Sequence, residues 1–336
     1  MDERDPVKAM ADDARDLYDI ATWERRTPVD HAATAMYWLL KVTFRATVVL
    51  LAFLLLVGVG GLSALTDPRI GVLAVLSVIP AFGLAGYVYY SDTTDAEPIT
   101  ALIATFLLGI LTANFAAASN TVLEPFFDPL GVIGMAAFFF VVVGPVEETV
   151  KLLAVRLYAY NTSSFNSVID GAVYGAMAGL GFATVENSLF IARQVGSIGM
   201  TSGFFELIDT GGGITAIRSL AGPGHVIYSA IAGYYLGLAK FNPNNRGPII
   251  IKGLFIAAVI HATYNSTVGF GSSLIADVLN VPPLIGFFGF VIVYDTIWGL
   301  YLLRKVRRYS ATFLQLQEQG EGGTNEADSE PGVKVR

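Results

Sequence analysis

The sequence contains no cysteine, which excludes disulfide bonds and thiolate metal ligands. It also contains neither an HExxH nor a GxSxG motif, so it lacks the signatures of zincin metalloproteases and of the α/β-hydrolase serine nucleophile. Charge is scarce: charged residues make up 15% of the 336 positions, against roughly 25% in soluble domains. Only three residues are histidines, so a histidine inside an apolar segment is informative.

Apolar residues are abundant and come in long runs. They make up 54% of the chain, the mean hydropathy is +0.58, and runs of about 18 residues or more, long enough to span a bilayer, recur. The sequence therefore predicts an all-α, polytopic transmembrane helical bundle of about eight spans. The expected spans cover residues 42–65, 70–90, 99–118, 133–158, 170–194, 219–239, 250–268 and 283–303.

Three regions follow from this pattern. Residues 1–40 are expected to form a polar cytoplasmic N-terminal segment, 41–305 the bundle, and 306–336 a disordered cytoplasmic tail. Within the first region, apolar residues at helical spacing between 7 and 21 fit either a short amphipathic helix or a solvated tail.

Lysine and arginine set the expected orientation in the membrane. They cluster before the first span, between the sixth and seventh spans and after the last, whereas the opposite side has only Arg69, Arg193 and Arg218. By the positive-inside rule, both termini are expected in the cytoplasm and the protein in the plasma membrane, surrounded by the lipid bilayer. No signal peptide is expected, because the first 35 residues are polar and acidic. The net charge of −7 disfavours nucleic acid as a partner.

Ionisable residues lie inside several of these spans. The stretch GPVEETVKLLAVRL, residues 144–157, carries Glu147, Glu148 and Lys151. A charged side chain at the bilayer centre costs on the order of 2.5–3.5 kcal/mol, so such residues are expected to face the bundle interior. Lys151 can reach either glutamate, and the two glutamates point about 100° apart on a helix. Different roles are therefore expected for them, although a buried ion pair that only fixes packing is the alternative.

The fifth span combines small residues with another glutamate. Gly171, Gly175 and Gly179 recur every four residues, a ladder that lets membrane helices pack closely. Glu186 lies two turns beyond this ladder and is expected to face a neighbouring helix. The alternative is a glutamate at the helix end, close to Arg193.

Two histidines fall in the sixth and seventh spans. His225 begins a face of small residues, and His261 shares a face with Asn265. A histidine at the membrane interface and a satisfied interhelical hydrogen-bond pair are the respective structural alternatives. Together with glutamates on other spans, these residues favour a functional site.

Carboxylates and imidazoles in one low-dielectric pocket suit the activation of water. Glu147 or Glu148, with Glu148 preferred for its closeness to Lys151, could act as general base, and His261 and Asn265 could stabilise the oxyanion. Two histidines and a carboxylate could instead hold a divalent metal such as zinc. A proton-coupled transporter with a buried Glu/His relay is the alternative function, and a non-catalytic scaffold is a third.

These residues, in this order, resemble the PrsW family of intramembrane proteases, relatives of the CAAX prenyl endopeptidases. The resemblance covers roughly residues 130–270 and rests on E147–E148–T–V–K151, F182–A–T–V–E186–N187, H225 and H261–A–T–Y–N265. In prenyl-processing relatives the second element carries histidine, so Glu186 favours PrsW.

The resemblance implies a helical bundle with its catalytic cavity inside the membrane. It implies an endopeptidase that hydrolyses a peptide bond of a membrane-embedded or membrane-anchored protein; in bacterial relatives the family is linked to cleavage of a membrane-anchored anti-sigma factor. The expected catalytic residues are Glu147, Glu148, Glu186, His225, His261 and Asn265. The expected supporting residues are Lys151, Phe182 and Asn187, and the expected metal ligands are Glu186, His225 and His261.

Overall fold

The computed structural model describes residues 6–10, 15–94, 96–195 and 204–327. Helices dominate these residues, and no β-strand occurs among them beyond one isolated bridge between Tyr18 and Thr22. The chain divides into two compact units, Met1–Leu51 and Ala52–Arg336. The boundary falls within helix α2 (Pro28–Gly58), about ten residues after the boundary expected from sequence.

The first unit holds α1 (Pro6–Met10) and most of α2. Asp30, in the first turn of α2, accepts hydrogen bonds from the backbone N–H of Thr27 at 2.7 Å and from the indole of Trp23 at 3.1 Å. These bonds anchor the start of the helix. The amphipathic helix considered for residues 7–21 is present only as the five-residue α1, and residues 11–14 lie outside the described residues.

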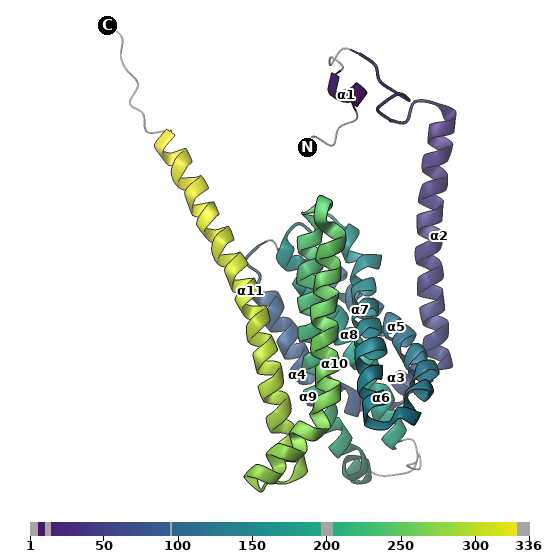
Figure 1. Cartoon of the computed structure of the whole chain (residues 1–336), viewed down its shortest axis with the longest axis vertical. Coiled ribbons are helices and arrows are strands. Elements are labelled where there is room, and N and C mark those ends of the chain that lie inside the picture. Colours follow the sequence, from purple (N-terminus) through teal and green to yellow (C-terminus); the bar gives the residue numbers. More distant parts are fainter. Residues whose placement is uncertain (1–5, 11–14, 95, 196–203, 328–336) are drawn as a thin grey trace. The chain divides into compact units, whose positions relative to one another are not determined.

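The second unit is a bundle of long helices (Figure 1). Its α-helices are α3 (Gly61–Thr66), α4 (Pro68–Tyr90), α5 (Ile99–Leu123), α6 (Gly131–Phe138), α7 (Gly144–Leu157), α8 (Val168–Val195), α9 (Phe204–Lys240), α10 (Arg246–Leu279) and α11 (Pro283–Ala327). Helix α7 contacts α8, α9 and α10, and α9 contacts both α8 and α10. These four helices surround the polar residues singled out in the sequence.

Seven helical segments within the described residues are long and apolar enough to cross a membrane. They confirm the predicted polytopic bundle, and one expected span, 219–239, is not among them. That span lies in α9, which begins at Phe204 and includes Arg218, His225 and several glycines. These residues lower its hydropathy, and a bundle can accommodate them because α9 packs against α4, α8, α10 and α11.

Helices α8 and α9 run antiparallel in close contact. A Cβ added at Gly171 would lie 2.2 Å from the carbonyl oxygen of Gly233, and one added at Gly175 would lie 2.3 Å from that of Ser229. The predicted small-residue ladder is thus confirmed. The close approach buries α8, whose most apolar window is 83% buried, and it holds Glu186 and His225 on facing surfaces.

A π-helical turn, Phe139–Val143, joins α6 to α7 directly before the paired glutamates. Pro145 follows it and has no backbone N–H to donate, so the regular α-helical hydrogen-bond ladder cannot continue through this point. Such π turns are frequent at functional sites. Here the turn sets the rotation at which α7 presents Glu147 and Glu148.

Helix α11 extends further than the sequence suggested. Residues 306–327 were expected to begin the disordered tail, but the helix continues to Ala327. Glutamine, leucine, alanine and arginine between residues 306 and 319 are good helix formers; the glycine-rich last turns to Ala327 have no such explanation. Residues 328–336 lie outside the described residues.

Candidate active site

A cavity of about 420 Å³ opens between α5, α7, α8, α9 and α10. Of the residues predicted to form the site, those that line it are Glu147, Phe182, Glu186, His225, His261 and Asn265. They come from four separate helices. The expectation that these side chains meet in one pocket therefore holds in the structure.

Glu147 faces the cavity from the first turn of α7. Its side chain is buried; one oxygen, Oε1, accepts a hydrogen bond from the amide of Asn120 on α5 at 3.1 Å. The other, Oε2, has no hydrogen-bond partner among the described residues and lies 3.7 Å from Nε2 of His261. This oxygen is free to contact a water molecule or a ligand in the cavity.

Glu148 is fully buried and is not among the residues that line the cavity. Its Oε1 accepts hydrogen bonds from the ammonium of Lys151 at 2.6 Å and from Nδ1 of His261 at 2.9 Å. An ionised carboxylate only accepts hydrogen bonds, so Nδ1 of His261 carries the proton. The unprotonated Nε2 then faces Glu147, as in metal sites where a carboxylate orients the histidine ligand.

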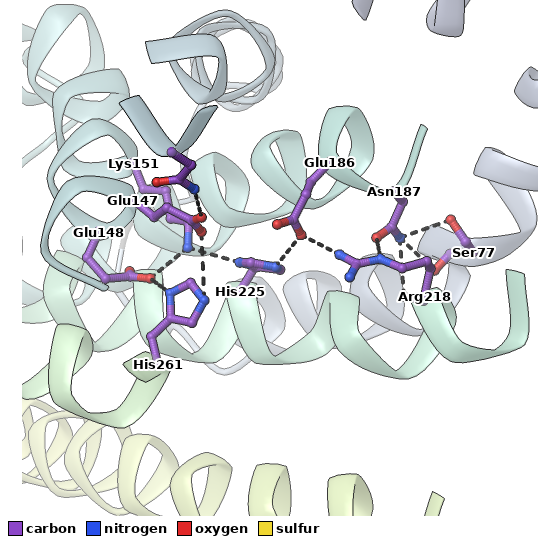
Figure 2. Close-up of polar contacts among 10 residues, drawn as sticks. Ser77, Glu147, Glu148, Lys151, Glu186, Asn187, Arg218, His225 and His261 are labelled. Atoms are coloured by element: carbon purple, nitrogen blue, oxygen red, sulfur yellow. Dashed lines mark hydrogen bonds and ion pairs between the residues drawn. The ribbon is translucent and has the colours of Figure 1, made fainter. Parts of the chain in front are cut away.

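A chain of polar contacts continues from Lys151 across α9 to α8 (Figure 2). The Lys151 ammonium donates to Nδ1 of His225 at 3.0 Å and lies 4.3 Å from the ring centre of Phe182. Because Nδ1 accepts this bond, Nε2 of His225 carries the proton and donates to Glu186 at 2.8 Å. Glu186 also forms an ion pair with Arg218.

Asn187 supports this chain from outside the cavity. Its amide nitrogen donates to the hydroxyl of Ser77 on α4 at 2.9 Å, and its amide oxygen accepts from Nε of Arg218 at 2.8 Å. Arg218 is therefore held on both sides, by Glu186 and by Asn187. The predicted supporting residues thus contact the groups that face the cavity.

The donor set at the centre suits a metal ion. One ligand atom from each of Glu147, His225 and His261 lies within 4.8 Å of the other two. Two imidazoles and a carboxylate are the ligands of catalytic zinc sites that keep a fourth position for water. The unpartnered, buried Oε2 of Glu147 is consistent with such a ligand. The set differs from the expected one in that Glu147 occupies the place given to Glu186, which is engaged by Arg218 and His225.

The charges of the buried side chains around the cavity also favour a bound cation. The carboxylates of Glu147, Glu148 and Glu186 face two basic side chains, Lys151 and Arg218. With neutral histidines, one negative charge in this buried group has no counterpart among the described residues. A cation or an additional proton would balance it, since an unpaired buried charge is costly.

Two residues that contact the expected site residues were missed from sequence. The span expected at residues 99–118 stops short of Asn120, whereas α5 continues to Leu123. Arg218 was assigned to the outer side because the sixth span was started at 219. The sequence signals that could have identified them were the amide of Asn120 and the basic side chain of Arg218, each at the edge of an apolar span.

The chain matches the family model described as PrsW family intramembrane metalloprotease over residues 97–297. Among known proteins, Protease PrsW of Geobacillus kaustophilus is 29% identical over 197 residues, covering 56% of this chain and 76% of that protein. Protease PrsW of Bacillus subtilis is 28% identical over 192 residues, covering 56% of this chain and 78% of that protein. Protease PrsW of Clostridioides difficile is 27% identical over 195 residues, covering 57% and 77%. No solved structure matches the chain significantly.

Proposed function

The chain belongs to the PrsW family of intramembrane metalloproteases, and we propose that Glu147 is the residue that activates water in its catalytic cavity. The observation that carries this proposal is the position of Glu147: its unpartnered Oε2 faces Nε2 of His261 at 3.7 Å inside the cavity. Glu148 does not line the cavity: its Oε1 is engaged by Lys151 and His261, and its Oε2, although also without a partner among the described residues, is buried outside the lining. This reverses the preference for Glu148 drawn from sequence.

In this proposal a divalent metal, with zinc the best fit to the donor set, is held by Glu147, His261 and His225. When bound, such an ion supplies a Lewis acid and lowers the pKa of water toward neutrality. His261 offers Nε2 because Glu148 holds the proton on Nδ1. His225 can offer Nε2 once its proton passes to Glu186, which already accepts a hydrogen bond from that nitrogen.

The protein groups themselves move the protons of hydrolysis. As the water oxygen bonds to the carbonyl carbon, the carboxylate of Glu147 accepts the proton that water loses. The same proton is then donated to the amide nitrogen when the C–N bond breaks, which yields a carboxylic acid and an amine. Asn265 lines the cavity and serves as an amide donor to the oxyanion.

We assign His261 to binding and not to the oxyanion hole. A neutral imidazole whose Nδ1 donates to Glu148 has no second proton to donate from Nε2. The role first expected for His261 would require an imidazolium. This leaves Asn265 as the oxyanion donor from α10.

The substrate is proposed to be a membrane-embedded or membrane-anchored protein. The cavity is lined by apolar residues of α6 and the π turn as well as by the polar set, so a peptide entering it can place side chains against an apolar wall. Both termini are proposed to face the cytoplasm of the plasma membrane. If α9, which runs antiparallel to α8, crosses the membrane as well as the seven apolar segments, the number of crossings is even and the termini share one side; the excess of lysine and arginine assigns that side to the cytoplasm.

The test uses the purified chain in proteoliposomes with a library of single-span membrane proteins, with new peptide termini identified by mass spectrometry. Glu147→Gln and His261→Ala are expected to abolish new termini while both variants remain in the membrane. Asp277→Asn, which changes an exposed carboxylate near the end of α10, is the matched control and keeps wild-type cleavage. Wild-type cleavage by Glu147→Gln would refute the assignment.

A further inference from the structure

A second group of carboxylates lies at the start of α8, away from the catalytic cavity. Asp92 and Glu97 belong to the segment between α4 and α5, and Asp170 lies in the first turn of α8. One oxygen from each lies within 4.8 Å of the other two. Asp170 and Glu186 are 16 positions apart on α8, about 24 Å at 1.5 Å per residue, and none of the three carboxylates lines the cavity.

Asp170 is well supplied with hydrogen-bond donors. Its Oδ2 accepts from the backbone N–H groups of Asn166 at 2.6 Å and Ser167 at 3.0 Å, and its Oδ1 accepts from the Ser167 hydroxyl. These bonds cap the helix and fix the carboxylate in place. Asp170 is therefore a rigid member of the group.

Glu97, unlike Asp170, is not supplied with hydrogen-bond donors by the described residues. Its side chain is buried, with the residue 3% exposed, and no donor among the described residues reaches either carboxylate oxygen. Asp92 accepts two bonds from Thr94 at 2.7 Å through Oδ1, while its Oδ2 is also buried without a partner. Three buried carboxylate oxygens in this group thus have no hydrogen-bond partner among the described residues, which is uncommon in folded proteins.

No basic side chain in the described part of the chain forms an ion pair with this group. Lys240 of α9 lies within electrostatic range of Asp170, but its ammonium donates to the backbone carbonyls of Tyr160 at 2.9 Å and Phe165 at 2.7 Å. The buried carboxylates must therefore be neutralised in another way. Burial raises the pKa of Glu97 to about 8, so a proton is one way and a bound cation is the other.

We propose that Asp92, Glu97 and Asp170 bind a hard divalent cation, Mg²⁺ or Ca²⁺. All the donors are oxygens, with no imidazole or thiolate, and this is the ligand class of these two ions. Ca²⁺–oxygen bonds of 2.3–2.6 Å allow ligand oxygens to lie up to about 5 Å apart, which accommodates the spacing here. Asp92 is only half-buried, so water can complete the coordination from its side.

The cation ties Asp92 and Glu97 to the first turn of α8. Thr94 already reaches toward this turn, since its hydroxyl oxygen lies 3.3 Å from that of Ser167. Helix α8 carries Glu186 at its other half, so the ion acts on the stability of the helix that supports the active site and does not touch the reacting atoms. The inference is independent of the proposed catalytic roles.

The test compares thermal unfolding of the full chain in detergent after chelation and after addition of MgCl₂ or CaCl₂. For the wild type, a cation concentration about 100-fold above Kd is expected to raise Tm by about 5 °C. Glu97→Gln is expected to lose this rise and, without cation, to be at least as stable as wild type, because it removes the unsatisfied charge. Asp277→Asn, whose carboxylate is exposed, is the matched control and keeps the full shift.

Two further variants complete the thermal-unfolding test. His261→Ala is expected to retain the Mg²⁺- or Ca²⁺-dependent rise, which separates this site from the catalytic donor set. Asp92→Asn is expected to lose it and provides a second variant beside Glu97→Gln. A wild-type Tm that responds to neither ion, as a shared proton between Asp92 and Glu97 would give, overturns the proposal, and so does an unchanged shift in both cluster variants.

Discussion

The adjacent residues Glu147 and Glu148 should respond to the same substitution in opposite ways. In Glu148→Gln the Lys151 ammonium stays at 0% side-chain exposure but loses its carboxylate, 2.6 Å away. Breaking a buried pair by removing one partner costs about 3–5 kcal/mol. Glu147→Gln leaves that pair intact and removes a carboxylate with one unpartnered oxygen, so we expect little loss of stability from it.

Activity should follow the reverse order. Glu147→Gln removes the group in the cavity and is expected to leave no detectable cleavage. Glu148→Gln removes the acceptor that orients His261; loss of such an outer partner typically lowers activity or metal affinity about 10- to 100-fold.

The measurement is the unfolding free energy in mixed micelles of detergent and SDS, made alongside initial rates of cleavage in proteoliposomes. Lys151→Met in the Glu148→Gln background is the internal control. It removes the stranded ammonium and should recover part of the lost stability, with a coupling of about 0.5–3 kcal/mol. If Glu148→Gln is as stable as Glu147→Gln, or if Glu147→Gln is the more active of the two, the separate roles assigned to the pair are wrong.

Three further predictions concern packing, the site and a helix cap. Gly175→Ala should destabilise the chain by about 1–3 kcal/mol in the same unfolding assay, because the added Cβ would lie 2.3 Å from a carbonyl oxygen of α9. Gly213→Ala is the control and should leave the unfolding free energy unchanged, because nothing lies within 4 Å of its added Cβ. Asn120→Ala should lower kcat/KM about tenfold or more through loss of the 3.1 Å bond to a catalytic carboxylate, and an unchanged rate would remove this amide from the site. A hydrogen bond from the side chain of Arg69 lowers the pKa of Asp67 from 3.8 to about 2. The stabilisation that the ionised Asp67 gives the folded state should therefore be present above pH 3.8 and lost as the pH falls through 2. The stabilities of wild type and Asp67→Asn, compared by thermal unfolding, should converge in acid, and a difference that stays constant with pH would contradict this.

Much of the fold could be predicted from the sequence because a bilayer imposes strict rules on a chain. Long apolar runs identify the spans, and the four-residue spacing of Gly171, Gly175 and Gly179 correctly indicated a close helix contact. What periodicity could not supply was the end of each helix. Helices α5 and α9 continue past polar residues, because neighbouring helices satisfy those residues where lipid could not.

The candidate active site could likewise be predicted only in part from the sequence. The angle of about 100° between adjacent helical residues predicted different roles for Glu147 and Glu148. It could not say which role belonged to which residue, since that depends on Asn120 and His261, which approach from other helices. The carboxylate group at the start of α8 was not anticipated, because Asp92 and Glu97 read as an ordinary acidic loop until the fold brings Asp170 beside them.

The proposed active site requires groups from distant parts of the chain to meet at one centre, and one double-mutant cycle tests this directly. Glu148 and His261 are 113 positions apart in sequence and joined by a 2.9 Å hydrogen bond between α7 and α10. Unfolding free energies of wild type, Glu148→Gln, His261→Ala and the double variant should give a coupling of at least about 0.5 kcal/mol. Additive losses, within about 0.3 kcal/mol, would contradict the convergence of these helices on a single catalytic cavity.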